Sequence, residues 1–240
     1  MYRFLAYAVL LILFVFAAIQ ISLPSRDSTH QVFNDSNHVE FESGVRRLRD
    51  GTVEVASLVS MPGVTSDMFR WWFSDYLQTT EHYRMWHPED HVWMGWEHKT
   101  LGEITGSHHL VHEYIGGELM KLRIQFAWPQ EILGYDPTDE NTVAICARVG
   151  ELESSLNIAE MCHVASNTPS GTELRSRFWL GVIADREAAG WQNFLLSLLA
   201  NNPISRQFAV SEIEGINLHK HCMEEMSYLA DLLPVIYKED

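Results

Sequence analysis

The sequence predicts an α+β fold in which a curved, largely antiparallel sheet surrounds a long C-terminal helix, with a pocket between them. Four segments are rich in strand-forming residues: residues 111–126, 142–149, 160–165 and 173–183. The Asn-Thr-Pro-Ser-Gly sequence at residues 167–171 is typical of a hairpin connection between the last two. Residues 210–233 instead repeat apolar side chains at helical spacing, which predicts the longest helix of the chain.

Shorter signals predict the remaining elements. Residues 53–59 alternate in part between apolar and polar side chains, which indicates a first strand. A Ser-Asp pair at residues 66–67 supplies the cap of a helix that carries large apolar side chains along one face. Pro88 argues against a continuous helix through residues 81–91. A second helix is expected over residues 188–199.

The chain divides into a transmembrane anchor or signal peptide at residues 1–23, a polar linker at residues 24–50 and a folded domain at residues 51–240. Only three residues between positions 4 and 23 are polar, over a length of roughly 30 Å of helix. Large residues stand where a signal-peptide cleavage site requires small ones, which favours an uncleaved anchor. We therefore expect a single-pass membrane protein with its C-terminal domain on the non-cytoplasmic side; a secreted protein is the alternative.

Composition and charge exclude two kinds of site. The formal net charge is −15, from 32 acidic and 17 basic residues. Such a chain repels phosphate backbones, and its densest basic run, residues 46–49, is followed at once by Asp50, so we expect no nucleic-acid partner. Cys146, Cys162 and Cys222 are too few and too scattered for a disulfide framework or a cysteine-based zinc site. We expect all three to be buried free thiols.

The histidines supply the strongest chemical signal. Seven of the twelve lie within residues 82–112, and His221 stands four residues before Glu225 in the predicted C-terminal helix. A helix returns to the same face after about 3.6 residues, so these two side chains can converge on one point and form half of a metal site. Cys222 and Met226 each follow one of the pair, so the pair borders the apolar face of the helix. A His–Glu pair buried there requires a partner for its charge, and a metal ion is one such partner.

The His-rich segment can supply the other half of the site. His87 and His91 are one candidate pair, although a proline between them leaves open whether His87 binds the ion or supports His91. In a strand, His109, Val111 and Glu113 share one face, which we expect to point inward. An inward carboxylate is costly unless it is paired, so Glu113 is a further candidate ligand.

Longer motifs surround these candidates. They are FRWWF at residues 69–73, YRMWHPEDH at 83–91, SHHLVHEYIGG at 107–117 and HCMEEM at 221–226. Together they resemble the diacetylphloroglucinol hydrolase family, in which phloretin hydrolase is the other well-known activity, and the similarity extends over residues 61–232. The resemblance implies a Bet v 1-like helix-grip fold and one zinc ion per chain with two His and two Glu ligands. It also implies cleavage of the carbon–carbon bond between an acyl group and a phenolic ring.

Carried over by position, the resemblance implies site residues. The zinc ligands would be His91, Glu113, His221 and Glu225. Glu118, five residues after Glu113, is the alternative to Glu113. Tyr83 and His163 match catalytic positions of the family, where they would donate protons or stabilise a phenolate.

The positions expected to contact the substrate include two departures from the family. Trp86, Met94 and Phe178 are the candidates. Met94 stands where the family has an Asn, and the region around Phe178 lacks a second active-site tyrosine that the family carries after His163. Both departures affect the choice of substrate more than the choice of metal.

The residue types suit the implied reaction, in which the ring carbon gains a proton and water attacks the acyl carbonyl, releasing a carboxylic acid. Zinc polarises a carbonyl or acidifies water, and a carboxylate can act as the base. Two alternatives stay open: a non-catalytic carrier of an apolar ligand, and a metal enzyme with another reaction, such as an iron-dependent oxygenase. The expected partners are a small aromatic ketone, the membrane through the N-terminal segment and, as an option, a second copy in a homodimer.

Overall fold

The computed structural model describes residues 23–34, 41–186 and 199–237, together with the isolated positions Tyr7, Val15, Trp191 and Leu195. Within these residues, eight strands form one antiparallel sheet in the order β1-β2-β8-β7-β6-β5-β4-β3. The strands are β1 (Gly44–Arg47), β2 (Val53–Pro62), β3 (His91–Glu97), β4 (His108–Ile115), β5 (Glu118–Ala127), β6 (Thr142–Glu151), β7 (Leu156–Thr168) and β8 (Gly171–Asp185). The helices are α2 (Arg26–His30), η1 (Gln31–Asn34), α3 (Ser66–Trp71), η2 (Trp72–Tyr76), α4 (Thr80–Trp86), α5 (Pro129–Leu133), α7 (Pro203–Ala209) and α8 (Glu212–Ile236).

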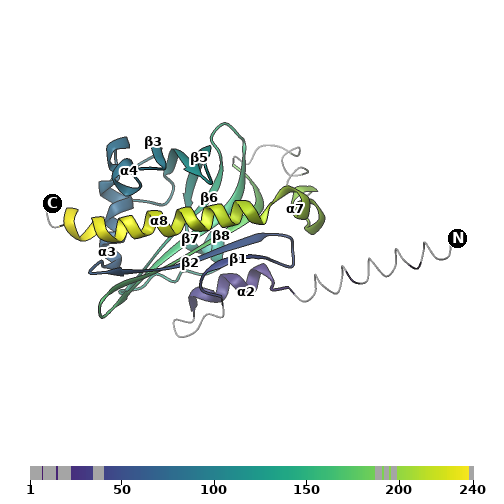
Figure 1. The fold of residues 1–240 in the computed structure, drawn as a ribbon, viewed down its shortest axis with the longest axis horizontal. Coiled ribbons are helices and arrows are strands. Elements are labelled where there is room, and N and C mark those ends of the chain that lie inside the picture. The colour runs from purple at the N-terminus through teal and green to yellow at the C-terminus, as the bar shows by residue number, and fades with distance from the viewer. Residues whose placement is uncertain are drawn as a thin grey trace.

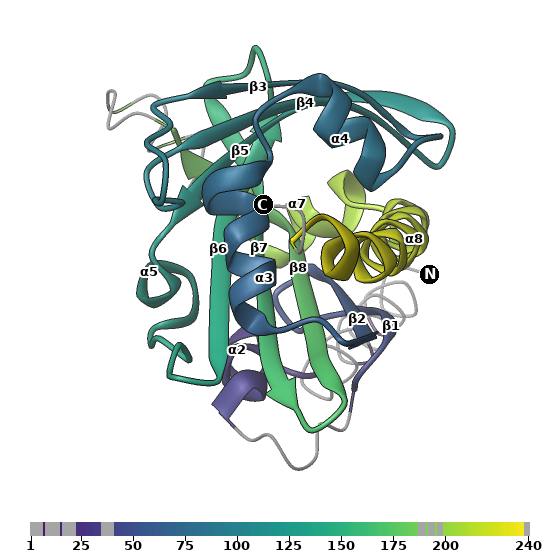
Figure 2. The same cartoon turned by 90° about the vertical axis from the view of Figure 1, so that its left-hand side faces the viewer.

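The sheet curves around the long helix α8, and the predicted α+β helix-grip arrangement is thereby confirmed (Figure 1, Figure 2). α8 buries Cys222, Met226, Leu229 and Leu233, which recur at the three- and four-residue spacing of one helical face. At its first turns the helix approaches the sheet closely at Gly215. A Cβ atom there would lie 2.8 Å from a methyl group of Val45, so only glycine fits without a shift of the neighbours.

Residues 81–91 do not form one continuous helix, as Pro88 predicts, but their first part is helical and belongs to α4. The Thr79 side chain accepts a hydrogen bond from the backbone N–H of His82 and caps the start of the helix. Pro88 restricts the residue before it, and His87 accordingly has an extended backbone, with φ −140° and ψ 92°. The chain then turns and enters β3 at His91, so the end of α4 fixes where that histidine lies.

The helix expected after residue 65 is present as α3, but it differs from the prediction in its N-cap and in how it ends. Its N-cap is Thr65, one residue before the predicted Ser-Asp cap, and the Thr65 hydroxyl accepts from the backbone N–H of Met68. After Trp71 the helix continues as a wider π-type turn, η2. Phe69 and Trp72 from this region are fully buried in the main core.

The expectation of three free thiols is wrong for two of the cysteines. Cys146 of β6 and Cys162 of β7 are directly paired across the two strands and form a disulfide, whereas Cys222 is free and buried. The two residues are 16 positions apart in the sequence. They become neighbours only through the register of the β6–β7 hairpin, which cysteine spacing does not reveal.

Part of the segment expected to be a polar linker is folded against the domain. Residues 24–50 include α2, η1 and β1, and β1 pairs with β2 as an edge of the sheet. The Trp179 indole N–H donates to the Thr29 hydroxyl over 2.9 Å, and the buried Arg177 guanidinium donates to the Phe41 carbonyl over 2.6 Å. The polar composition of this segment did not predict its folding, because the residues that bond it, Trp179 and Arg177, lie on β8, more than a hundred positions away in the sequence.

The expectation of a single-pass membrane anchor, with the domain on the non-cytoplasmic side, is corrected. Among the residues that the structure describes, no helix combines the length and the apolar character needed to cross a membrane. The longest, α8, has 25 residues but carries charged side chains such as Lys220 and Glu224. The predicted segment itself, residues 1–23, lies outside the described residues except at Tyr7, Val15 and Leu23. Most of the helix expected over residues 188–199 also lies outside them.

The disulfide makes a prediction that thiol counting can test. Protein unfolded without reductant should expose one reactive thiol per chain, Cys222, and three after reduction. Because the bond closes a loop of sequence separation 16, its reduction should lower the free energy of unfolding by about 3 kcal/mol. A Cys222→Ser variant, the matched control, should show no thiol before reduction. Three reactive thiols in the unreduced wild-type protein would show that the bond does not form.

Candidate metal centre

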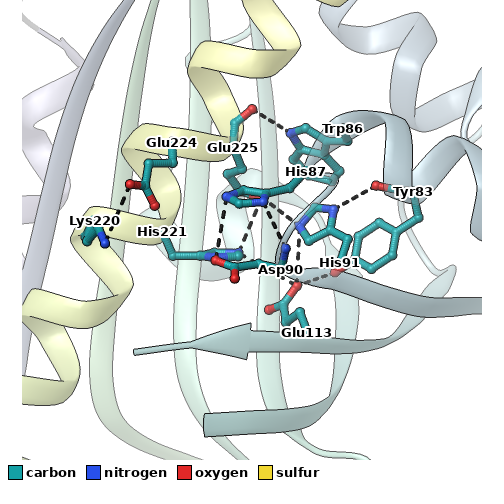
Figure 3. A network of polar contacts seen from close by, with 10 residues as sticks. All are labelled: Tyr83, Trp86, His87, Asp90, His91, Glu113, Lys220, His221, Glu224 and Glu225. Carbon is teal, nitrogen blue, oxygen red and sulfur yellow. Dashed lines mark hydrogen bonds and ion pairs between the residues drawn. The ribbon is translucent and has the colours of Figure 1, made fainter. Parts of the chain in front are cut away.

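Four buried side chains from three elements meet beneath α4: His91 of β3, Glu113 of β4, and His221 and Glu225 of α8 (Figure 3). The Nε2 atom of His91 lies 3.8 Å from Glu113 Oε2 and 3.6 Å from Glu225 Oε2. The Nε2 atom of His221 lies 4.0 Å from each of the same two oxygens. We call these four residues the His/Glu cluster.

Regular secondary structure brings the cluster together. His91 and Glu113 are direct cross-strand partners in the register of β3 and β4. His221 and Glu225 are one helical turn apart on α8, as their spacing predicts. The predicted alternation along β4 is also confirmed, because His109, Val111 and Glu113 are all buried. Exposed Glu118 follows the Gly116–Gly117 turn, so the structure brings Glu113 and not Glu118 into the cluster.

Both cluster histidines present an unprotonated nitrogen to the carboxylates. The Nδ1 atom of His91 lies 2.8 Å from the Tyr83 carbonyl oxygen, which can only accept, so the ring proton is on Nδ1. The Nδ1 atom of His221 lies 3.2 Å from the Asp90 carboxylate, and the same reasoning applies. Each ring therefore turns a lone pair on Nε2 toward the cluster, and within the described residues neither buried Nε2 has a hydrogen-bond partner.

The electrostatics of the cluster suit a bound cation. The pKa of Glu225 is raised to about 8, mainly because the carboxyl group is buried; His221 acts to lower this pKa, and the nearby Glu113 acts to raise it. Burial also lowers the pKa of His91, which favours the neutral ring. Two unprotonated imidazole nitrogens facing two carboxylates form a donor set that can hold a metal ion, and His91, Glu113 and His221 are close enough to share one.

Tyr83 borders the cluster directly. Its ring stacks on that of His91 with centroids 3.7 Å apart, and its hydroxyl donates a hydrogen bond to Glu113 Oε2. Burial and the Glu113 carboxylate hold the pKa of Tyr83 well above its usual value of 10. The side chain is therefore a protonated phenol, hydrogen-bonded to one of the candidate ligands.

The structure places His163 apart from the cluster. Its Nδ1 atom lies 2.6 Å from the Ser176 hydroxyl, and its ring packs edge-on against Phe178. Burial lowers the pKa of His163 to about 3, so the ring is neutral. In the described part of the chain, no hydrogen bond or ion pair joins His163 to the four cluster residues.

The expected substrate contacts share a single core with Tyr83. Trp86, Met94 and Phe178 are all buried in it. The Trp86 indole N–H donates to the Glu225 carbonyl over 3.0 Å, and its ring packs edge-on against His91. Met94 is fixed through its backbone, since both its N–H and its carbonyl bond the Thr80 hydroxyl.

Sequence reasoning missed Asp90. Its carboxylate contacts His221, although the two residues are 131 positions apart in the sequence. The only signal was an Asp immediately before His91 in the HPEDH motif. Such a contact is made through the tertiary fold, so spacing alone could not assign it.

Two other features lie away from the cluster. A cavity of about 400 Å³ is lined by residues of α3, the 102–105 loop, β5 and β6, and contains no cluster residue. A further group at Glu97, His98 and His108 is close enough to share an ion. However, the Arg123 guanidinium already bonds Glu97 there over 2.6 Å, so that charge is compensated.

The fold and the cluster together define a helix-grip protein with a buried His/Glu centre that can hold a metal ion. The chain matches the DAPG hydrolase PhiG domain family over residues 23–238, and it belongs to that family. It is 29% identical over 221 residues to the 2,4-diacetylphloroglucinol hydrolase of a Pseudomonas species, which covers 85% of this chain and 74% of the relative. It is 27% identical over 201 residues to the phloretin hydrolase of Eubacterium ramulus, which covers 80% and 69%.

Among solved structures, ginseng major latex-like protein 151 from Panax ginseng aligns with 70% of this chain and 98% of its own, at 14% identity and a TM-score of 0.39. The predicted family and the predicted enzyme class, a hydrolase, are confirmed by the sequence relatives.

The buried His109 gives a prediction about acid stability. Its ring stacks on Trp96, and burial lowers its pKa to about 3, below the ordinary value of 6.5. The unfolded chain therefore takes up a proton below pH 6.5 that the folded chain refuses, so stability is lost as the pH falls from 6.5 toward 3. Between about pH 7 and pH 5 this one residue should remove roughly 2 kcal/mol from the free energy of unfolding.

Denaturant unfolding of wild type and His109→Gln at both pH values tests this, because the pH-dependent loss should be about 2 kcal/mol smaller in the variant. His98→Asn, at an exposed histidine with a positive φ that Asn tolerates, should keep the wild-type loss. An equal loss in His109→Gln and wild type would contradict the prediction.

Proposed function

We propose that this protein is a zinc-dependent hydrolase that cleaves the carbon–carbon bond between an acyl group and a phenolic ring and releases a carboxylic acid. Its membership of the family and the names of its relatives support the reaction class, hydrolysis of carbon–carbon bonds in ketones. The main support for a bound metal is the pair of buried Nε2 atoms, on His91 and His221, which face two carboxyl groups and have no hydrogen-bond partner among the described residues.

Zinc suits this donor set, because it binds imidazole nitrogens and carboxylate oxygens in sites of four ligands. His91 and His221 would bind through Nε2, and Glu113 and Glu225 through their carboxylates. Bound there, zinc would supply Lewis acidity toward a carbonyl or water oxygen. The homodimer stays a prediction.

The protein's own groups can handle the protons that the reaction moves. Hydrolysis adds hydrogen to the ring carbon and hydroxyl to the acyl carbon, while the electrons of the broken bond stay with the ring. Tyr83 carries a phenolic proton beside the cluster and is a candidate to donate it, or to hydrogen-bond the phenolic oxygen of the substrate. Glu113 accepts a hydrogen bond from that hydroxyl, so a proton that Glu113 takes from the attacking water can pass to Tyr83 as Tyr83 gives its own to the ring carbon.

The surroundings suit a flat, partly apolar substrate. Trp86, Met94 and Phe178 are buried in the same core as Tyr83, and we propose that they contact the ring and the acyl chain. His163 lies against Phe178 and is neutral, so it would act as a hydrogen-bonding group and not as a charge. The Phe178 side chain offers no hydroxyl, so polar recognition of the ring would fall mainly to Tyr83 and His163.

The metal content of the purified protein tests whether the His/Glu cluster binds zinc. Wild-type protein purified without chelator should contain about one zinc per chain and release acid from 2,4-diacetylphloroglucinol or phloretin. His221→Ala should lose both, because it removes one of two imidazole donors. The matched control is His219→Ala on the same helix, whose ring instead contacts the Ser43 hydroxyl over 2.8 Å and which should keep both. Zinc retained at full occupancy in His221→Ala would refute the ligand set.

The Tyr83→Phe variant tests the role of the Tyr83 hydroxyl in the reaction separately from metal binding. The variant keeps the ring that stacks on His91 but loses the hydroxyl bonded to Glu113. Turnover of the same acylphenols should fall roughly 100-fold while zinc content is unchanged. Tyr76→Phe, a half-buried tyrosine of η2 stacked on Trp72, is the control and should leave turnover unchanged. Wild-type turnover in Tyr83→Phe would exclude the hydroxyl from the reaction.

A further inference from the structure

The Asp90 carboxylate contacts two histidines, His87 and His221, whose rings stack on each other. Its Oδ2 atom is 3.2 Å from His221 Nδ1 and 3.6 Å from His87 Nε2 (Figure 3). The two rings are nearly parallel, with centroids 5.2 Å apart and an interplanar angle of 12°. Both rings are buried, whereas the Asp90 side chain is half-buried. The family resemblance implies no role for Asp90.

Hydrogen bonds fix the proton positions on both rings. The backbone N–H of Asp90 donates to His87 Nδ1 over 3.1 Å, so that nitrogen is an acceptor and the ring proton of His87 is on Nε2. That N–H lies 3.6 Å from Asp90 Oδ2, an electrostatic contact longer than a hydrogen bond, and within the described residues His87 Nε2 has no hydrogen-bond partner. The Asp90 carboxylate can only accept from His221, which places the His221 ring proton on Nδ1 and leaves Nε2 unprotonated.

The backbone holds Asp90 in place for this contact. The His91 N–H donates to the His87 carbonyl over 3.0 Å, which closes a turn over residues 87–91. The Tyr114 N–H donates to the Asp90 carbonyl over 2.9 Å, which ties the same turn to β4. The same turn therefore places His91 in the cluster and, through the Asp90 side chain, contacts His221 on α8.

We propose that Asp90 and His87 are positioning residues: His87 orients the Asp90 carboxylate, and Asp90 holds His221 as the Nδ1–H tautomer with Nε2 aimed at Glu113 and Glu225. This inference rests on the proposed zinc site. In this arrangement His87 would not be a zinc ligand, because its Nε2 carries the ring proton and lies toward Asp90. A carboxylate behind a ligating imidazole fixes the ring and raises its basicity, and loss of such a partner weakens metal binding about 10- to 100-fold.

Zinc affinity of the full chain, measured by competition with a chromophoric chelator, tests the proposal. Asp90→Ala should bind zinc about 10- to 100-fold more weakly than wild type. Asp90→Asn should lose less, because its amide oxygen can still accept from Nδ1–H, and His87→Gln should also lose less, because its amide N–H can replace the Nε2–H donor. Glu89→Ala, at an exposed residue of the same turn, is the control and should bind as wild type.

A second readout separates positioning from a general loss of structure. Ring ¹⁵N NMR of the zinc-loaded protein should show His221 protonated at Nδ1 in wild type and Glu89→Ala, and a weakened or mixed signal in Asp90→Ala. Metal-free Asp90→Ala should melt within a few degrees of metal-free wild type.

The zinc measurements on wild type and Asp90→Ala test the positioning role of Asp90 separately from the proposed zinc-dependent hydrolysis. One zinc per wild-type chain with unchanged affinity and His221 signal in Asp90→Ala would overturn the positioning role and leave the hydrolase proposal standing. Two zinc ions per wild-type chain, one of them lost in Asp90→Ala, would make His87, Asp90 and His221 a metal site of their own and also overturn it. No zinc binding by wild type would overturn both.

Discussion

The arrangement of the protein's interior depends on burying two carboxyl groups and two imidazole rings in contact. Taking a carboxylate out of water costs several kcal/mol unless an opposite charge compensates it. In the described part of the chain, the basic side chains within 4 Å of Glu113 and Glu225 are His91 and His221, and a ring whose single proton is on Nδ1 supplies no positive charge. A divalent cation bound among these four groups would compensate the negative charge of the two carboxylates, so the buried cluster is stable when it holds a metal.

The fold is arranged to keep that cluster fixed. α8 carries His221 and Glu225 beside the apolar stripe that begins with Cys222 and Met226, so packing of the stripe sets the orientation of the polar pair. The close approach at Gly215 sets the distance between the helix and strands β1 and β2. From the other side, the β3–β4 register presents His91 opposite Glu113. Each half of the site is therefore built on regular secondary structure, which holds ligand side chains more precisely than loops do.

How much of this the sequence could predict depends on the range of each interaction. The spacing of His221 and Glu225, the alternation that turns Glu113 inward and the break at Pro88 are local, and all three match the structure. The Cys146–Cys162 disulfide depends on the register of two strands, and the folding of residues 24–50 depends on partners on β8. Asp90 acts on a residue 131 positions away, so nothing in its neighbourhood identifies its partner.

The most direct test of the central claim is the zinc K-edge X-ray absorption spectrum of the loaded protein. We expect four nitrogen and oxygen neighbours at about 2.0–2.2 Å, with outer-shell scattering from two imidazole rings and no sulfur. A sulfur neighbour at about 2.3 Å would bring Cys222 into the site, and scattering from three imidazoles would make His87 a ligand. Either result would contradict the assignment of the metal to two histidines and two glutamates.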